Sequence, residues 1–325
     1  MGAVAAAALA LAACGSAAEP PRPEPVMPTS SSPEAMGRER DMNLREGQVN
    51  PTPSELVLDA VVDPAVNQTF FLWEAGKMAS LPEHLGAEMV SGEDGVGFRP
   101  TVVTYPVPEG VQIKGAVLVN AGGAFQFRSN GVEGEPTAQA LAELGYQSFL
   151  VNYRLRPYTQ EEAALDLQRA VRFVRAHADD YGFDPADIAV MGFSAGGILS
   201  GEQALNFQGA VNGTSLDADY RPDALDEVSA DVGAVGMIYS FYGRLSVAST
   251  DVEAFRRANL PPTFYLWGSE DPFTDQFPQS VAALREAGVA VEEHVLDGWP
   301  HGFGTRGGWV DEYFDGWLSR TFGVN

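Results

Sequence analysis

The sequence contains little cysteine and little lysine. Its one cysteine, Cys14, can form no intramolecular disulfide and cannot contribute to a multi-cysteine metal site. Lys77 and Lys114 are the only two lysines in 325 residues, and 20 basic against 44 acidic residues give a formal net charge of −24. A surface this acidic repels phosphate backbones, so a nucleic-acid partner is not expected.

The sequence also lacks an apolar run long enough to span a bilayer, which requires about 20 residues. Its amino end carries the short run Ala3–Ala13, which fits the apolar region of a secretory signal, although no Lys or Arg precedes it. The run leads into Leu11-Ala12-Ala13-Cys14-Gly15, which resembles the bacterial lipoprotein box. We therefore predict a lipoprotein-type signal over residues 1–14, with lipid on Cys14 and an exported protein held in the cell envelope, periplasmic or at the outer surface. An incidental cysteine is the alternative.

Residues 15–54 differ in composition from the rest of the chain. Eight of the 22 prolines fall there, together with Ser, Thr and Glu and without apolar periodicity. This composition is typical of a disordered tether. Most of the negative charge lies in residues 55–325, which we interpret as one catalytic domain.

Within residues 55–325, short apolar runs alternate with amphipathic stretches, as in an α/β protein. Such regular crossovers predict a mostly parallel central sheet flanked by helices. The expected strands are Thr101–Val107, Gly115–Asn120, Gln147–Tyr153, Asp187–Met191, Ala234–Ser240, Thr263–Trp267 and Ala290–Leu296. The expected helices are Glu135–Leu144, Glu161–Ala178, a helix ending near Phe207, Asp251–Ala258, Asp275–Ala287 and Val310–Arg320.

The segment Gly192-Phe193-Ser194-Ala195-Gly196 follows a predicted strand and precedes a predicted helix. This is the context of the G-x-S-x-G elbow, in which a strained turn exposes the serine hydroxyl. A side chain in place of either glycine would collide with the neighbouring strand and helix. The turn also directs the Ala195 N–H, at the positive end of the helix, toward a developing oxyanion. Ser194 is therefore predicted to be a nucleophile.

The region from about Thr101 to Phe322 resembles the α/β-hydrolase superfamily. It is similar to small microbial esterases of the acetylxylan and feruloyl esterase type and, more distantly, to the hormone-sensitive-lipase-like group. The resemblance implies an α/β-hydrolase fold with a serine, acid and histidine in that chain order, and it is less specific to a substrate. The segments that carry it are Asn120-Ala-Gly-Gly-Ala-Phe125, Val151-Asn-Tyr-Arg-Leu-Arg-Pro157, Gly192-Phe-Ser-Ala-Gly-Gly197 and Pro300-His-Gly-Phe303.

Four histidines could serve as the base for Ser194. His84 lies in a weakly patterned region, His177 lies near the end of a predicted helix, and His294 lies on a predicted strand. His301 lies in the turn after the last strand, where the fold implied by the resemblance places the base. We therefore expect His301 to take the serine proton.

The strand Thr263–Trp267 leads into Gly268-Ser-Glu-Asp-Pro272, which offers two acids for the histidine. The resemblance places the acid immediately before the proline and so implies Asp271. Glu270 and Asp275 remain alternatives. An acid here would hold His301 in one tautomer and stabilise its cation.

The turn Ala121-Gly122-Gly123-Ala124 stands where relatives have His-Gly-Gly-Gly or Pro-Gly-Gly-Gly. The resemblance implies an oxyanion hole built from the N–H groups of Gly122, Gly123 and Ala195. The two alanines at the ends of the turn depart from the pattern, and they leave open how the loop is braced and which N–H points inward. The glycines do not fit a phosphate loop, which needs G-x-G-x-x-G or a Lys-Ser/Thr pair.

Aromatic residues are frequent in the predicted loops. Each one could be core or rim packing, but together they indicate a cleft suited to a sugar face or an aryl group. The polar segment 206–231 could form a small lid, and no long apolar lid is evident. The candidate cleft residues are Phe125, Phe127, Tyr242, Phe273, Trp299 and Phe303.

These features predict a serine-dependent carboxylic ester hydrolase that acts on short acyl or feruloyl esters of plant polysaccharides, without a metal or an organic cofactor. The expected partner is a small-molecule or polysaccharide ester, with membrane contact only through Cys14. Two alternatives stay open. One is a serine peptidase of the prolyl-oligopeptidase kind, which shares the elbow and the triad order. The other is a non-catalytic binding protein with the same fold.

Overall fold

The computed structural model describes residues 54–55, 60–85, 93–95 and 97–324. The predicted signal segment 1–14 with Cys14, and the predicted tether up to residue 53, lie outside the described residues. Within the described ranges, no helix has both the length and the apolar character needed to cross a bilayer.

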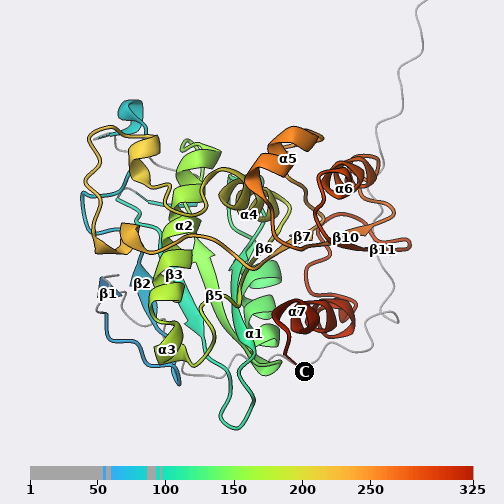
Figure 1. Cartoon of the computed structure of the whole chain (residues 1–325), viewed down its shortest axis with the longest axis horizontal. Coiled ribbons are helices and arrows are strands. Elements are labelled where there is room, and N and C mark those ends of the chain that lie inside the picture. The colour runs from blue at the N-terminus through green and yellow to red at the C-terminus, as the bar shows by residue number, and fades with distance from the viewer. Residues whose placement is uncertain (1–53, 56–59, 86–92, 96, 325) are drawn as a thin grey trace, which may run out of the picture. The chain divides into compact units, whose positions relative to one another are not determined.

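One large sheet organises the described part of the chain (Figure 1). Its strand order is β1-β2-β3-β5-β4-β6-β7-β10-β11. Strand β3 runs antiparallel to both of its neighbours, and all other neighbours pair in parallel, so the predicted mostly parallel sheet is confirmed. The strands are β1 (Ser54–Glu55), β2 (Thr69–Phe71), β3 (Thr101–Tyr105), β4 (Gly115–Asn120), β5 (Tyr146–Asn152), β6 (Ile188–Phe193), β7 (Ala234–Ile238), β10 (Thr263–Gly268) and β11 (Val291–Leu296).

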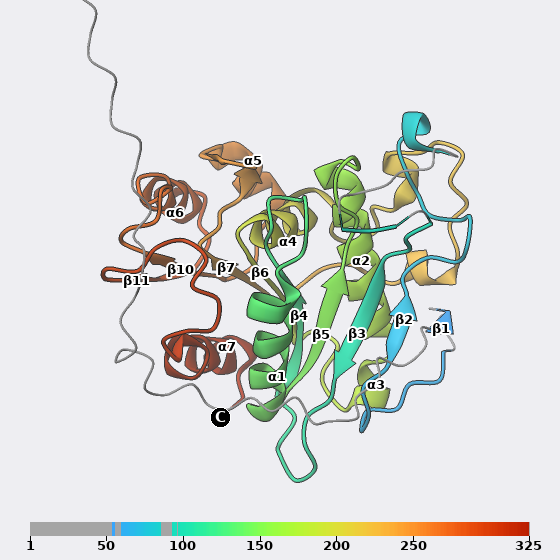
Figure 2. The ribbon, with the colours of Figure 1, turned by 180° about the vertical axis from the view of Figure 1, so that it is seen from behind.

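Helices cover both faces of this sheet. Figure 1 shows α2 in front of the strands, and Figure 2, from behind, shows α1 in front of them. On the α2 side, α4, α5 and α6 follow as successive neighbours, and α1 contacts the turn that precedes α7. The helices are α1 (Glu135–Glu143), α2 (Gln160–Ala176), α3 (Ala178–Tyr181), α4 (Ala195–Asn206), α5 (Val252–Ala258), α6 (Phe277–Glu286) and α7 (Asp315–Phe322).

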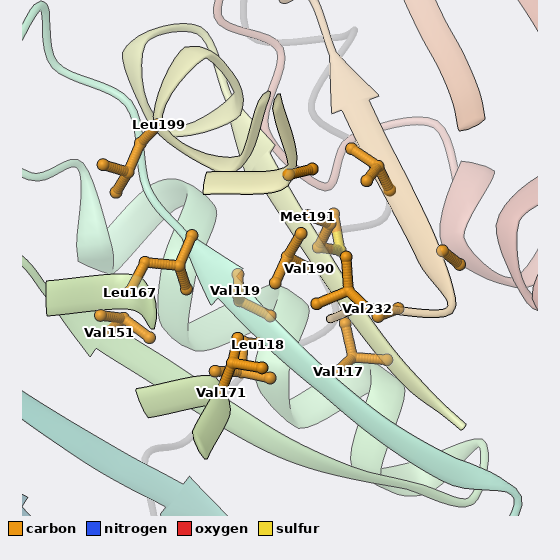
Figure 3. Packing of buried hydrophobic residues seen from close by; sticks show 14 of the residues in the cluster. Val117, Leu118, Val119, Val151, Leu167, Val171, Val190, Met191, Leu199 and Val232 are labelled. Atoms are coloured by element: carbon orange, nitrogen blue, oxygen red, sulfur yellow. The ribbon is translucent and has the colours of Figure 1, made fainter. Parts of the chain in front are cut away.

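The core lies on both sides of β4, whose six residues are all buried. This explains its unbroken apolar sequence, since a central parallel strand is covered on both faces. Leu167 and Val171 of α2 lie beside Leu118 and Val119 of the strand (Figure 3). Full burial of such a side chain contributes about 1.5–3 kcal/mol, so this contact holds α2 firmly against the sheet.

Several elements do not appear in the sequence pattern. Strands β1 and β2 have two and three residues, too few for a period-two signal. The same holds for the separate hairpin of β8 (Gly243–Arg244) and β9 (Val247–Ala248). The predicted helix Val310–Arg320 begins as a π-helical turn, Val310–Phe314, and becomes α-helical only at Asp315.

The segment 206–231, considered above as a small lid, packs against α2 instead. Arg169 of the helix bonds to Asp223, and Arg172 bonds to Asp226. The Gln168 side-chain amide donates to the carbonyl of Phe207 at 2.7 Å. These bonds secure the segment to the flank of the helix layer, so the lid interpretation is corrected.

Candidate active site

Ser194 stands between β6 and α4 in a strained conformation, with φ 49° and ψ −118°. A Cβ at Gly192 would lie 2.2 Å from the carbonyl carbon of Gly196, and a Cβ at Gly196 would lie 2.1 Å from the carbonyl oxygen of Asn120. Both glycines are therefore required by close backbone packing. The Ser194 N–H donates to the carbonyl of Ile238 at 3.0 Å, which ties the turn to the neighbouring strand β7.

Three side chains distant in sequence form one hydrogen-bonded chain. His301 Nε2 lies 2.9 Å from Ser194 Oγ, and His301 Nδ1 lies 2.6 Å from Asp271 Oδ2. Asp271 is buried, and its other carboxylate oxygen accepts the N–H of Phe273 at 2.8 Å. The histidine side chain remains 28% exposed, so a substrate can reach it. This is the geometry of a nucleophile, a general base and an orienting acid.

The alternative acids, Glu270 and Asp275, are exposed, and neither bonds to a histidine. The remaining histidines have other acidic partners. His84 lies 2.8 Å from Glu162, His177 lies 2.9 Å from Asp180, and His294 lies 3.0 Å from Glu292. The structure thus brings together the three residues that the sequence singled out, and it keeps the other candidates apart from Ser194.

The Ala121–Ala124 turn lies next to the nucleophile, since a Cβ at Gly122 would approach Ser194 Cβ to 3.0 Å. The Gly122 N–H, however, donates to the Glu133 carboxylate at 2.6 Å. This amide is already engaged, which corrects its predicted place in the oxyanion hole. The N–H groups of Gly123 and Ala195 have no hydrogen-bond partner among the described residues. These two amides therefore remain free to bind an oxyanion.

The structure shows how the turn is braced despite its two alanines. The Tyr153 hydroxyl, from the Val151–Pro157 segment, donates to the Ala121 carbonyl at 2.6 Å. The Ser129 N–H donates to the Gly122 carbonyl at 3.0 Å. Gly123 has φ +131°, and a Cβ there would lie 2.1 Å from the Phe127 carbonyl oxygen. The turn is thus held by Tyr153 and by its own tight fold, and only glycine fits at position 123.

Glu133 and Tyr239 were not identified from the sequence. Glu133 lies in the π-helical turn Asn130–Gly134 and is buried, and burial raises the pKa of its carboxyl. The Tyr239 hydroxyl donates to Glu133 at 2.6 Å and accepts the Gly304 N–H at 3.2 Å. Burial, reinforced by the charge of Glu133, also raises the pKa of Tyr239. The positive φ of Tyr239, 37°, is a local signal of strain that only the structure reveals.

The six candidate cleft aromatics divide into two groups. Phe127 is 49% exposed, and Phe273 and Trp299 are partly exposed; the Phe273 ring lies 5.7 Å from that of His301. Tyr242 is fully buried, with its hydroxyl 3.1 Å from that of Thr263. Tyr242 is therefore core, and its assignment to the cleft is corrected.

Two further candidates, Phe125 and Phe303, are also buried. Phe125 is 6% exposed and packs edge-on against Tyr153. Phe303 is fully buried, with its ring 4.6 Å from that of Tyr239. Both are buried against tyrosines, which corrects their predicted place in the cleft.

Comparison with known proteins shows which proteins this chain is similar to. Residues 105–259 match the BD-FAE family model. The chain is 28% identical over 250 residues to the endo-1,4-beta-xylanase B of Butyrivibrio fibrisolvens, covering 71% of this chain and 38% of that protein. It is 29% identical over 206 residues to the acetylxylan esterase of Xylanibacter ruminicola, covering 58% and 41%. The chain thus spans about two fifths of the length of these curated relatives.

A solved structure agrees with these matches. The acetyl ester-xyloside bifunctional hydrolase from Caldicellulosiruptor lactoaceticus superposes with a TM-score of 0.59 at 23% identity, covering 79% of this chain and 97% of that one. The chain has the α/β-hydrolase fold, as predicted. Its predicted resemblance to acetylxylan esterases is also confirmed.

Proposed function

We propose that this chain is a serine carboxylic ester hydrolase in which Ser194, His301 and Asp271 form the catalytic triad. The observation that carries the proposal is the continuous hydrogen-bonded chain from Ser194 Oγ through both ring nitrogens of His301 to the buried Asp271. The strained elbow holds the hydroxyl at the edge of the sheet where the carboxyl ends of the parallel strands meet.

In the proposed mechanism, Ser194 Oγ attacks the acyl carbon of the ester while His301 Nε2 takes its proton. Asp271 accepts the Nδ1–H and stabilises the imidazolium that forms. The N–H groups of Gly123 and Ala195 bind the tetrahedral oxyanion. His301 then donates the proton to the leaving alcohol and activates a water molecule, which hydrolyses the acyl-enzyme.

For the substrate we propose short acyl esters or feruloyl esters of plant polysaccharides. The names of the two curated relatives, an endo-1,4-beta-xylanase and an acetylxylan esterase, support this class. Phe127 and Trp299 leave ring surface exposed near the site, and aromatic faces of this kind suit sugars and aryl groups.

We also propose export and attachment to the cell envelope through lipid on Cys14, on the strength of the sequence Leu11–Gly15 alone. Replacement of this cysteine by serine should release the protein from membranes and remove the lipid mass from the amino-terminal peptide. A variant that stays with the membrane fraction would contradict the proposal.

Three assays test the substrate class: acetate release from acetylated xylan, ferulate release from feruloylated arabinoxylan, and hydrolysis of p-nitrophenyl acetate. Ser194→Ala is the control and should lose about six orders of magnitude in kcat. Hydrolysis of the small ester alone would retain the hydrolase and reject the polysaccharide. Cleavage of aminoacyl amides in preference to esters would favour a peptidase.

A further inference from the structure

Glu133 is a buried carboxylate that the proposed mechanism does not use. It is 6% exposed, and no arginine or lysine among the described residues forms an ion pair with it. Its two oxygens instead accept hydrogen bonds from the Gly122 N–H and the Tyr239 hydroxyl. A buried carboxylate without a cationic partner is costly, and its location therefore calls for an explanation.

The contacts of Glu133 reach both the oxyanion turn and, through Tyr239, the loop that carries His301. Gly122 immediately precedes Gly123, one of the two amides left free for the oxyanion. Tyr239 packs its ring 4.8 Å from that of His301 and accepts the N–H of Gly304, three residues beyond the histidine. A single carboxylate thus connects the oxyanion turn, the end of β7 and the loop that carries the base.

The segment around Glu133 is also packed directly against the histidine loop. A Cβ added at Gly304 would lie 2.7 Å from the carbonyl oxygen of Val132. The π-helical turn that carries Val132 and Glu133 therefore has little room to shift, and π-helical turns are frequent at functional sites.

We propose that Glu133 is a positioning residue of the ester hydrolase, which with Tyr239 fixes the direction of the Gly123 N–H and the placement of His301. This inference rests on the proposed function. The negative charge also favours the cation that His301 becomes after it takes the serine proton, because the two groups are close enough to interact electrostatically. Both effects act in the transition state and leave substrate binding largely unchanged.

The chemistry of the contact requires a carboxylate. Both partners of Glu133 are donors, the Gly122 N–H to one oxygen and the Tyr239 hydroxyl, which also accepts the Gly304 N–H, to the other. Glutamine has the same shape but only one acceptor oxygen, so its NH2 group would face a donor. Glu133→Gln therefore removes one of the two hydrogen bonds without opening a cavity.

The test compares Glu133→Gln and Tyr239→Phe in the full chain, with p-nitrophenyl acetate as substrate. Glu143→Gln, the same change at an exposed position of α1, is the matched control. Removal of a whole oxyanion donor costs about 10²–10³ in kcat, so we expect each misaligned variant to lose about 10–100-fold in kcat with KM nearly unchanged. Affinity for a boronic acid transition-state analogue should fall by a similar factor.

The double variant should lose no more kcat than the less active of the two single variants, because both changes interrupt the same connection. If Glu133→Gln does not fold, Tyr239→Phe carries the same test. If Ser194→Ala abolishes the wild-type activity but Glu133→Gln and Tyr239→Phe both retain it, this inference is overturned and the proposed function stands. A loss confined to thermal stability, or a rise in KM without a fall in kcat, would overturn it as well. A wild-type chain that hydrolyses no ester would overturn the proposed function and this inference together.

Discussion

Two regions of this protein contain buried carboxylates with different kinds of partner. Beside α2, Asp166 accepts the Arg154 guanidinium at 2.9 Å, and Glu162 lies 3.9 Å from the same group; all three side chains are fully buried. At the candidate active site, Asp271 and Glu133 are also buried, but their hydrogen bonds come from a histidine, a tyrosine and backbone amides.

The difference separates a structural from a chemical use of buried charge. Arg154 is always protonated, so it gives Asp166 and Glu162 a permanent cation. This group of three residues, the α2 cluster, acts as a fixed joint between α2 and the chain before it. At the site, His301 bonds to Asp271 and interacts electrostatically with Glu133, and it gains its charge only when it takes a proton. The site thus holds negative charge in advance of a cation that forms during the reaction.

Asp271→Asn should show the largest effect, since it removes that charge without changing the shape of the side chain. We expect a fall of about 10⁴-fold in kcat, because an amide in this position favours the wrong histidine tautomer. The melting temperature should change little. Steady-state kinetics and thermal denaturation measure the two effects, with exposed Asp275→Asn as the control. If both variants were equally active, Asp271 would not be the triad acid.

Arg154→Met should show the opposite pattern. It leaves Asp166 buried without its cation, and the loss of one partner from a buried pair costs about 3–5 kcal/mol. The kcat of the folded fraction should be unchanged. Urea denaturation and kinetics at low temperature test this, with Arg320→Met, an exposed ion-pair residue, as the control. Lower kcat with normal stability would mean that the α2 cluster also serves the chemistry.

Gly123→Ala should weaken the oxyanion turn specifically. Its Cβ would collide with the Phe127 carbonyl, and its φ of +131° is unfavourable for alanine. Displacement of this N–H should lower kcat by about 10²–10³-fold with a small change in KM. Gly131→Ala, at a position with free space and no positive φ, should behave like the wild type. Equal activity of the two variants would exclude the Gly123 amide from the oxyanion hole.

The parts of the fold that the sequence predicted are those with a local signal. Strand β4 matches its predicted bounds because a fully buried strand is a continuous apolar run. Ser194 was identifiable because the elbow needs glycine at fixed spacing, and His301 because it stands in the turn after the last strand, where the resemblance places the base. Each of these signals lies within a few consecutive residues.

The contacts that orient the site carry no local signal. Glu133 and Tyr239 are 106 positions apart in the chain, and Glu133 lies in a segment that reads as an ordinary polar turn. Nothing in the Ala121–Ala124 sequence indicates that the Gly122 amide turns toward this carboxylate. The burial of Tyr242 and the exposure of Phe127 were likewise undetermined, because both aromatics follow buried strands closely and only tertiary packing separates them.

Phe127→Ala and Tyr242→Phe extend the comparison to these aromatic side chains, with smaller expected effects. Phe127 is half exposed beside Gly123, so its removal should leave the melting temperature unchanged. KM for an aryl ester should rise by about 3–10-fold, since an aromatic contact contributes about 0.5–1.5 kcal/mol.

Tyr242→Phe should instead leave KM unchanged and cost about 1 kcal/mol of stability, through loss of the hydrogen bond to Thr263. Kinetics with p-nitrophenyl and methyl esters, combined with thermal denaturation, distinguish the two outcomes. If Phe127→Ala changed stability but not KM, the exposed ring would support the turn and would not contact the substrate. Phe127 would then have a structural role, as the residues of the α2 cluster do. Substrate selection by an aromatic ring would depend on Phe273 and Trp299.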